Sequence, residues 1–292
     1  MMPDYNMKIS VVIPTYNRKL SLHRCLCSFR AQSLPRDQWE VIVVNDGGED
    51  VSETVSAFEK DFPVSCHYQP NQGPATARNK GARMAAGRFI AFTDDDCEPA
   101  PDWLEMIQRM AADSRLIGGK VINKFRHNPC SESSQVLIDF LYEYFRDTSD
   151  LFFTSNNLVV SKADFESIGG FDQSFGTSAG EDREFCVRAR QSGLELAFCG
   201  DIRIHHLHFL SLRSFYRMHR KYGRAAYDYQ RAIARQAVPA TTRPRFHFYF
   251  SMLRYAFRQD RYSFREKLAY SLLMLLSQAA VAHGFFSRKL GK

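Results

Sequence analysis

Three adjacent carboxylates, Asp94, Asp95 and Asp96, directly follow the apolar run Phe89–Thr93. A run of aromatic and β-branched residues that ends in acids is typical of a buried strand that delivers carboxylates to the edge of a sheet. Three neighbouring negative charges repel one another, so the cluster favours a bound cation. Because its ligands are hard oxygens, Mg²⁺ or Mn²⁺ is expected rather than zinc. The alternative interpretation is a solvated acidic turn.

Two further segments have the chemistry of a nucleotide site. Asp46 follows the apolar run 41–45, where its carboxylate can accept a hydrogen bond from a base imide or a ribose hydroxyl, and the glycines after it let backbone pass close to a ligand. Gly73 and Pro74 open a helical pattern that carries Arg78 one turn in, facing either a nucleotide or a nearby acid. The alternative for Asp46 is a turn residue satisfied by its own backbone. The sequence contains neither a Walker A loop nor a GxGxxG motif.

Downstream, one acidic pair and one histidine cluster offer acid–base and metal chemistry. Glu181 and Asp182 begin a helical stretch, where an acid either stabilises the helix start or serves as a general base that faces an acceptor. His206 and His208 would share a face of an extended segment, and one of them is a candidate to complete a metal site. The alternative for these histidines is a structural or surface role.

Alternating strand and helix patterns position these residues. Helices are expected near 19–31, 51–60, 75–86 and 103–112, between and after strands at 9–13, 40–45, 64–68, 89–93 and 116–121. The alternation predicts an α/β fold with a mainly parallel sheet, in which ligands bind beyond the carboxyl ends of the strands. Polar segments follow three of these strands, at 14–18, 45–48 and 93–96, so we expect all three along one rim. Further strands are expected at 152–160, 194–199 and 202–206, a helix through 181–190, and helices from 211 onward with a break bracketed by Pro239 and Pro244.

Together these segments resemble the family 2 glycosyltransferases, which have the GT-A fold. The order and spacing of the matching stretches cover roughly residues 8–208. They are Ser10-Val-Val-Ile-Pro-Thr-Tyr-Asn-Arg18, Val43-Val-Asn-Asp-Gly-Gly48, Gly73-Pro-Ala-Thr-Ala-Arg-Asn-Lys-Gly81, Gly87-Arg-Phe-Ile-Ala-Phe-Thr-Asp-Asp-Asp96, Ser155-Asn-Asn-Leu-Val-Val160, Ile168-Gly-Gly-Phe-Asp172 and Gly180-Glu-Asp182.

The resemblance implies a role for each candidate residue. Asp94 and Asp96 would form the Asp-x-Asp pair at the ribose, the diphosphate and the metal, with Asp96 as the direct ligand and His206 as a further one. Asp182, with Glu181 beside it, would supply the catalytic base. The implied nucleotide-sugar site comprises Pro14, Thr15, Tyr16, Arg18, Asp46, Gly73, Arg78, Asp94 and Asp95.

The implied reaction is an inverting, Mn²⁺- or Mg²⁺-dependent transfer of a sugar from a nucleotide-diphosphate donor to an acceptor hydroxyl. A UDP-sugar is the expected donor, and a lipid-linked or cell-envelope glycan is the expected acceptor. Two other functions remain open at this point: a sugar nucleotidyltransferase and a non-catalytic module that binds nucleotide sugars or membranes. A nucleotidyltransferase would need a Gly-rich, basic loop after the first strand, and residues 14–17 do not supply one.

Composition and charge divide the chain. Its 292 residues, 45% apolar, predict one large domain with an appendage, placed as a catalytic domain over 1–210 and a helical extension over 211–292. From residue 203 onward, 18 basic residues face 3 acidic ones, a net charge of +15, whereas the first 202 residues carry −8. Seven scattered cysteines and the absence of an apolar N-terminal stretch predict reduced thiols in a cytoplasmic protein.

The basic extension contains an apolar run. Residues 268–286 hold no Asp, Glu, Lys or Arg, and as a helix they would span about 28 Å. In-plane contact with an anionic membrane surface, a helix packed on the catalytic domain and a true span are the three alternatives. The apolar run favours a membrane over nucleic acid as the partner, which places the protein peripherally on the inner face of the cell membrane.

Overall fold

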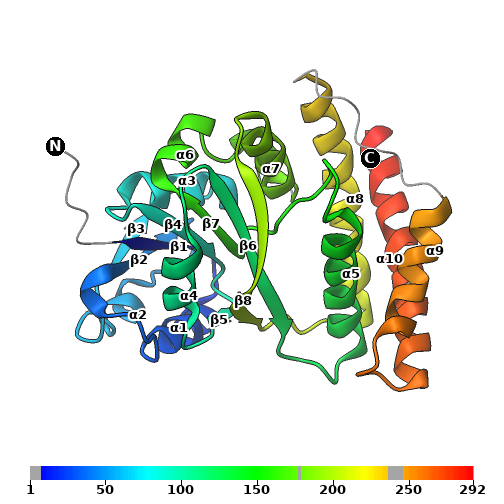
Figure 1. The fold of residues 1–292 in the computed structure, drawn as a ribbon, viewed down its shortest axis with the longest axis horizontal. Coiled ribbons are helices and arrows are strands. Elements are labelled where there is room, and N and C mark those ends of the chain that lie inside the picture. Colours follow the sequence, from blue (N-terminus) through cyan, green and yellow to red (C-terminus); the bar gives the residue numbers. More distant parts are fainter. Residues whose placement is uncertain (1–7, 177–178, 236–245, 292) are drawn as a thin grey trace. The chain divides into compact units, whose positions relative to one another are not determined.

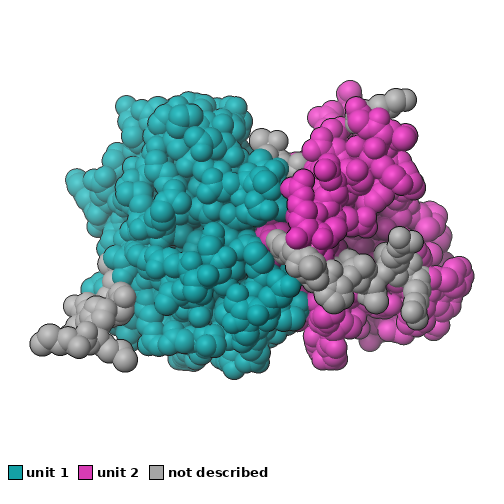
Figure 2. Space-filling view, turned by 90° about the horizontal axis from the view of Figure 1, so that it is seen from above, with its two compact units in different colours: residues 1–122, 153–177, 185–206 teal, residues 123–152, 178–184, 207–292 magenta. Residues whose placement is uncertain are grey.

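The structure is a computed structural model that describes residues 8–176, 179–235 and 246–291 (Figure 1). The chain forms two compact units, coloured separately in Figure 2. Unit 1 comprises Met1–Ile122, Phe153–Thr177 and Phe185–His206, and unit 2 comprises Asn123–Phe152, Ser178–Glu184 and Leu207–Lys292. The predicted domain division at residue 210 stays a prediction. The last boundary between the units lies near it, but unit 2 also takes in two earlier segments.

Unit 1 is built on one mixed sheet. In its described part, eight strands lie in the order β3-β2-β1-β4-β7-β6-β8-β5. The first four in this order are parallel, whereas β7 pairs antiparallel with β4 and β6, and β5 pairs antiparallel with β8. The strand bounds are β1 Ile9–Thr15, β2 Trp39–Asn45, β3 Val64–Tyr68, β4 Phe89–Thr93, β5 Cys97–Pro99, β6 Arg115–Asn123, β7 Asn157–Ser161 and β8 Glu195–His206.

Helices cover the sheet because alternate strand residues point to opposite faces. Val11, Ile13, Val41 and Val43 share one apolar core with the buried residues of α1 (Lys19–Phe29), α2 (Ser52–Ser56) and α4 (Trp103–Met110). On the other face, α3 (Pro74–Met84) approaches β1 and β2 so closely that a Cβ at Gly81 would lie 2.4 Å from Val12.

The same face continues over β4 with a cluster of four phenylalanine rings. Phe92 of β4 contacts Phe165 of α6 (Lys162–Ile168) and Phe171, with ring centroids 5.2 and 5.1 Å apart. Phe185 of α7 (Glu181–Gln191) completes the cluster, 4.8 Å from Phe171. These contacts fix the loop that follows α6 against the strand that carries the acidic triplet.

Most predicted strands of the sheet are confirmed, and the differences lie in its antiparallel part and in one helix. The expected strand at 152–160 is the shorter β7, and the two expected strands at 194–199 and 202–206 form one continuous β8 through Gly200. Helix α5 (Pro129–Phe145) and strand β5 were not predicted. The start of α5 nevertheless has ordinary signals: Pro129 is the first helical residue, and the Asn128 side chain accepts a hydrogen bond from the Ser131 amide at 2.9 Å.

Unit 2 is helical in its described part. It holds α5, α8 (Leu212–Arg235), α9 (Phe246–Tyr255), the short η3 (Ala256–Arg258) and α10 (Phe264–Lys289). Phe140, Phe248, Met252 and Met274 are among the residues that form its core. Helices α8 and α10 cross at Gly223 and Gly284. The contact is close, since a Cβ at Gly284 would lie 1.9 Å from the Arg220 carbonyl oxygen. The break expected between Pro239 and Pro244 lies outside the described residues.

Candidate active site

The three polar segments meet at the carboxyl end of the parallel strands, as their order along the chain predicts. Thr15 of β1 is paired with Asn45 of β2, and Val12 of β1 is paired with Phe92 of β4. Parallel neighbours end at the same edge of a sheet. The residues that follow β1, β2 and β4 therefore lie side by side along one rim of unit 1.

Asp95 is the buried centre of the acidic triplet. It accepts a hydrogen bond from the Thr15 hydroxyl at 2.7 Å and pairs with the Arg18 guanidinium at 3.1 Å. Burial raises the pKa of Asp95 to about 6; Arg18 acts against this rise, and the charges of Asp96 and Asp94 add to it. Only 4% of its side chain is exposed, so Asp95 ties the ends of β1 and β4 together.

Asp94 and Arg78 form an ion pair at the same rim. Arg78 Nη2 lies 2.7 Å from Asp94 Oδ1, and the Arg78 side chain is 5% exposed. The guanidinium also lies over the Phe171 ring, 5.9 Å from its centroid. Arg78 reaches this place because the helix it belongs to begins at Pro74, after Gly73 with its φ of +92°. The sequence allowed either a nucleotide or an acid as its partner; the structure pairs it with Asp94, and contact with a nucleotide stays a prediction.

Asp46 holds the loop that leads into α3. Its carboxylate accepts hydrogen bonds from the Gln69 side chain at 2.7 Å and from the amides of Gln72 and Gly73 at 2.9 and 2.8 Å. A carboxylate has about four acceptor positions, so these three bonds leave capacity for one more donor. Asp46 therefore shapes the loop and can still accept a hydrogen bond from a ligand at the rim.

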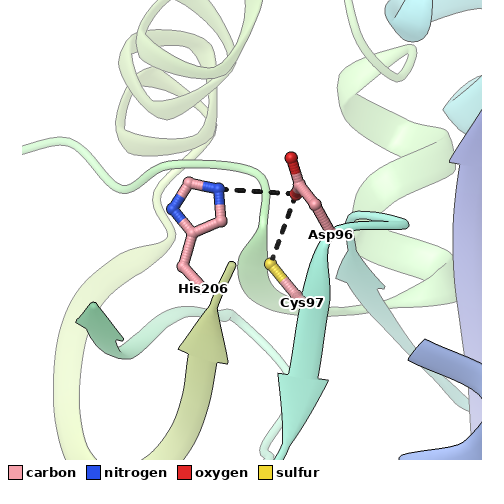
Figure 3. Close-up of side chains that lie close together, drawn as sticks. All are labelled: Asp96, Cys97 and His206. Carbon is pink, nitrogen blue, oxygen red and sulfur yellow. Dashed lines mark hydrogen bonds and ion pairs between the residues drawn. The ribbon is translucent and has the colours of Figure 1, made fainter. Parts of the chain in front are cut away.

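Asp96 lies beside Cys97 and His206 (Figure 3). Cys97 is paired with His206 across β5 and β8, which brings the imidazole next to the acid that precedes Cys97. His206 Nε2 is 3.4 Å and Cys97 Sγ is 3.9 Å from Asp96 Oδ1, and Arg18 Nη1 is 2.9 Å from Asp96 Oδ2. Carboxylate oxygen fits Mn²⁺ or Mg²⁺, and the imidazole nitrogen fits Mn²⁺ the better of the two because Mg²⁺ takes oxygen ligands.

The local electrostatics affect the protonation of Cys97 and His206 differently. Burial raises the pKa of the Cys97 thiol well above its usual range, and the charges of Asp96 and Asp94 add to the rise, so the thiol stays protonated and does not suit a hard cation. Burial acts to lower the pKa of His206, but its hydrogen bond to Asp96 and the nearby negative charges outweigh burial, and the pKa is raised. Asp96 and His206 are the two residues that would hold the metal, and a bound cation would replace the proton that Asp96 stabilises on the imidazole.

Glu181 and Asp182 begin α7, as the sequence predicted for a helix start, and both belong to unit 2. Asp182 Oδ1 accepts a hydrogen bond from the Arg183 amide at 2.8 Å, and Glu181 is buried. The Arg183 guanidinium lies over Phe152 and Tyr229, 5.2 and 4.8 Å from the ring centroids. This stacking anchors the first turn of α7 within unit 2. Of the other candidates, Pro14 is the last residue but one of β1, and Tyr16 and Arg18 follow the strand along the rim; Tyr16 is 47% exposed.

Sequence reasoning missed three residues that shape this rim. Gln69 follows β3 and bonds to Asp46, so the rule that located the other strand ends would also have found it. Asn17 has a φ of +53° and accepts a hydrogen bond from the Glu49 amide at 2.9 Å, which closes the loop after β2. Cys97 directly follows Asp96 in the chain, but its place opposite His206 depends on the pairing of β5 with β8, and the sequence has no signal for that strand.

Comparison with known proteins identifies the class. The model of glycosyl transferase family 2 matches residues 10–168, and a model described as the N-terminal domain of galactosyltransferase matches residues 140–212. A validoxylamine A glucosyltransferase of Streptomyces hygroscopicus is 28% identical over 221 residues, which cover 64% of this chain and 52% of that protein. The chain thus spans about half the length of that relative.

Solved structures confirm the fold. A mannosyltransferase from Pyrobaculum calidifontis in complex with GDP-Man and Mn²⁺ superposes with a TM-score of 0.67 at 16% identity, over 98% of this chain and 88% of that one. TarS of S. aureus in complex with UDP-GlcNAc superposes with a TM-score of 0.57 at 16% identity, over 98% of this chain and 93% of that one. The sheet of unit 1 is therefore of the GT-A type. The chain belongs to glycosyl transferase family 2, a family of sugar-transferring enzymes.

Proposed function

We propose that the protein is a metal-dependent, inverting glycosyltransferase that moves a sugar from a nucleotide-diphosphate donor to an acceptor hydroxyl. The observation that carries this proposal is the rim of unit 1, where Asp94, Asp95 and Asp96 meet two arginines and His206. A diphosphate needs cationic partners, and a hard cation needs carboxylate ligands. The rim offers both within one row of strand ends.

The chain's own residues account for donor binding. The exposed Tyr16 and the carboxylate of Asp46 are available to the base and the ribose, with Pro14 and Thr15 at the end of β1 beside them. Arg78 holds Asp94, so Asp94 faces the donor with a fixed orientation. Asp96 and His206 would hold Mn²⁺ or Mg²⁺, which when bound supplies positive charge that stabilises the departing diphosphate.

Asp182 is the proposed general base. An inverting displacement needs a carboxylate that takes the proton from the acceptor hydroxyl, with no covalent intermediate on the protein. Asp182 is fixed at the start of α7 by its hydrogen bond to the next amide and by the stacked Arg183. Glu181 beside it is buried, so Asp182 is the better placed of the two acids to meet an acceptor.

The donor and the acceptor are proposed at the level of chemical class. A UDP-sugar is the first candidate donor; TarS binds UDP-GlcNAc, and the mannosyltransferase with the same fold binds GDP-Man. A lipid-linked or cell-envelope glycan is the proposed acceptor, and a peripheral position on the inner face of the cell membrane is the proposed location. The net charge of +15 after residue 202 supports this location, since anionic lipid attracts basic segments.

Thermal unfolding with a panel of nucleotide sugars tests the proposal. We expect a UDP-sugar to raise the unfolding temperature in the presence of Mn²⁺ and much less in excess chelator, because a ligand that binds only the folded state stabilises it. The Asp46→Ala variant should lose this protection, and the Asp182→Asn variant should keep it. Protection that is equal with and without the metal, or that is lost in Asp182→Asn and kept in Asp46→Ala, would contradict the assigned roles.

A further inference from the structure

Helix α10 has two faces of different character. One face packs inside unit 2 through Tyr270, Met274 and Gly284, all buried. On the opposite face, eight apolar residues recur every three or four positions, so they form one continuous line along the helix. We call this line the α10 stripe: Phe264, Leu268, Leu272, Leu275, Ala279, Ala282, Phe286 and Leu290, all exposed.

The α10 stripe is unusually apolar for a surface that faces water. Leu272 is 58% exposed and Phe264 is 71% exposed, and the stripe contains no charged residue. Neighbouring exposed aromatics widen it at its beginning: the ring of Phe257 in η3 lies 6.1 Å from that of Phe264, and Phe250 of α9 is 49% exposed. A contiguous apolar surface of this kind marks a place where another apolar surface docks.

Basic side chains lie at both ends of the stripe. Arg254, Arg258 and Arg265 are exposed near its beginning, and Lys289 is exposed at its end. The acid nearest the beginning, Glu266, is engaged in the capping box with Ser263. The stripe therefore combines an uncharged middle with positive ends.

This charge pattern selects the occupant. A second copy of the chain would bring positive ends together in either a parallel or an antiparallel arrangement of the two helices, and like charges at such contacts are unfavourable. An anionic lipid surface instead places phosphate groups at both ends and hydrocarbon at the middle. Charge complementarity thus favours lipid over self-association.

The packing of α10 selects the mode of binding. The helix is long and apolar enough to cross a membrane by length and composition, but a third of its most apolar 18-residue stretch is buried inside the protein. Its buried face meets α8 at the close contact between Gly284 and the Arg220 carbonyl oxygen. Because α8 carries seven Lys and Arg residues, a span that kept this contact would draw charge into hydrocarbon. Contact in the plane of the surface keeps the packing and the charges in place.

We infer that the α10 stripe binds anionic lipid surfaces as an in-plane amphipathic face, with its arginines at the headgroup phosphates. This inference rests on the proposed membrane location and names the surface through which the protein binds there. It does not depend on the sugar-transfer reaction, so the two are tested by separate measurements.

Flotation of the full chain with vesicles tests the inference. We expect binding to phosphatidylcholine vesicles that contain 25% phosphatidylglycerol, weaker binding to pure phosphatidylcholine, and partial loss of binding at high salt. The variant Leu268→Gln/Leu272→Gln/Leu275→Gln should bind about 100-fold more weakly, because three half-exposed leucines no longer enter the hydrocarbon boundary. Arg258→Gln/Arg265→Gln should weaken only the salt-sensitive part, by about 5-fold for each arginine.

Matched controls keep the test specific. Leu20, Met84 and Met110 are exposed apolar residues of unit 1, and their triple substitution by glutamine should leave vesicle binding unchanged. Circular dichroism and donor hydrolysis should stay at the wild-type level in both triple variants. Equal vesicle binding by the stripe variant and the wild type would overturn the inference. So would a wild-type dimer that the stripe variant converts to monomer without any change at vesicles.

Depth-dependent quenching separates an in-plane helix from a span. The two native tryptophans, Trp39 and Trp103, are fully buried in unit 1, so a Leu272→Trp variant carries one exposed reporter in the middle of the stripe. An in-plane helix enters only about 5–10 Å, so bromine near the headgroup end of the acyl chain should quench this tryptophan more strongly than bromine near the chain end. Stronger quenching by the deep bromine would show a span and overturn the in-plane inference.

Discussion

Arg18 and a divalent cation compete for the same carboxylate. The Arg18 Nη1 atom lies 2.9 Å from Asp96 Oδ2 and 3.1 Å from Asp95 Oδ1, and Asp96 is also the acid closest to His206. A metal that binds Asp96 therefore weakens or displaces the guanidinium. Replacing this guanidinium with the neutral amide of Arg18→Gln should strengthen metal binding by the free protein.

The size of this effect follows from the exposure of the ion pair. Two unit charges about 3 Å apart attract by about 1.4 kcal/mol in water and by more in a partly buried place. The Arg18 side chain is 54% exposed, so screening and side-chain entropy reduce the net competition to about 1 kcal/mol. We therefore expect Arg18→Gln to bind Mn²⁺ about 5-fold more tightly.

The affinity for the nucleotide-sugar donor should change in the opposite direction. Once a metal occupies Asp96, the Arg18 guanidinium is available to the diphosphate, so its loss should weaken nucleotide-sugar binding in saturating Mn²⁺. The intensity of the free Mn²⁺ electron paramagnetic resonance signal measures the metal without any turnover, and calorimetry measures the donor. Arg30→Gln is the matched control, since Arg30 is 49% exposed and pairs with Asp61 at 2.6 Å, away from the acidic triplet. Unchanged or weaker Mn²⁺ binding in Arg18→Gln, beside a wild-type Arg30→Gln, would refute the competition.

Three further predictions address the base, a buried histidine and the helix crossing. Asp182→Asn should reduce sugar transfer by about 10²–10⁴-fold while calorimetry shows wild-type donor binding; loss of donor binding would contradict its role as base. Burial lowers the pKa of His219 to about 4, below the usual 6.5, so this group's contribution to stability is present above pH 6.5 and is lost as the pH falls towards 4. Over this interval, urea unfolding of the wild type should lose about 3 kcal/mol relative to His219→Gln; the same pH slope in both proteins would contradict it. Gly284→Ala should destabilise unit 2 by about 2–4 kcal/mol, because the new Cβ would lie 1.9 Å from the Arg220 carbonyl oxygen, whereas Gly200→Ala, with 3.9 Å of room, should be neutral in the same unfolding assay.

The parallel part of the sheet could be predicted from the sequence because its strands are buried on both faces. Runs such as Phe89–Thr93 are apolar without interruption, and each run ends at a polar residue, so both the strand and its end are visible. The position of the polar segments along one rim could be predicted from the order of the strands alone. The pairing of Thr15 with Asp95 then needs nothing beyond the parallel register.

The antiparallel part was harder to predict. β8 contains Gly200 and exposed residues on both sides of it, so its pattern breaks into two apparent strands. β5 has only three residues, and its pairing with β8 is what brings His206 to Asp96. Such a register depends on residues far apart in the chain, and neither segment carries a local signal for it. The ion pairs of Arg18 and Arg78 are of the same kind, since the sequence shows the charges but not the partners.

Metal-dependent release of UDP from a UDP-sugar by the full chain tests the proposed activity most directly. After chelation, activity should vanish, and Mn²⁺ or Mg²⁺ should restore it in the wild type and in Asp113→Asn, a control acid that is 57% exposed and pairs with Arg88. Asp96→Asn should stay several orders of magnitude less active at saturating metal while it unfolds at the wild-type temperature in chelator. Full activity of the wild type in excess chelator, or near-wild-type activity of Asp96→Asn, would contradict the metal-dependent transfer proposed for this rim.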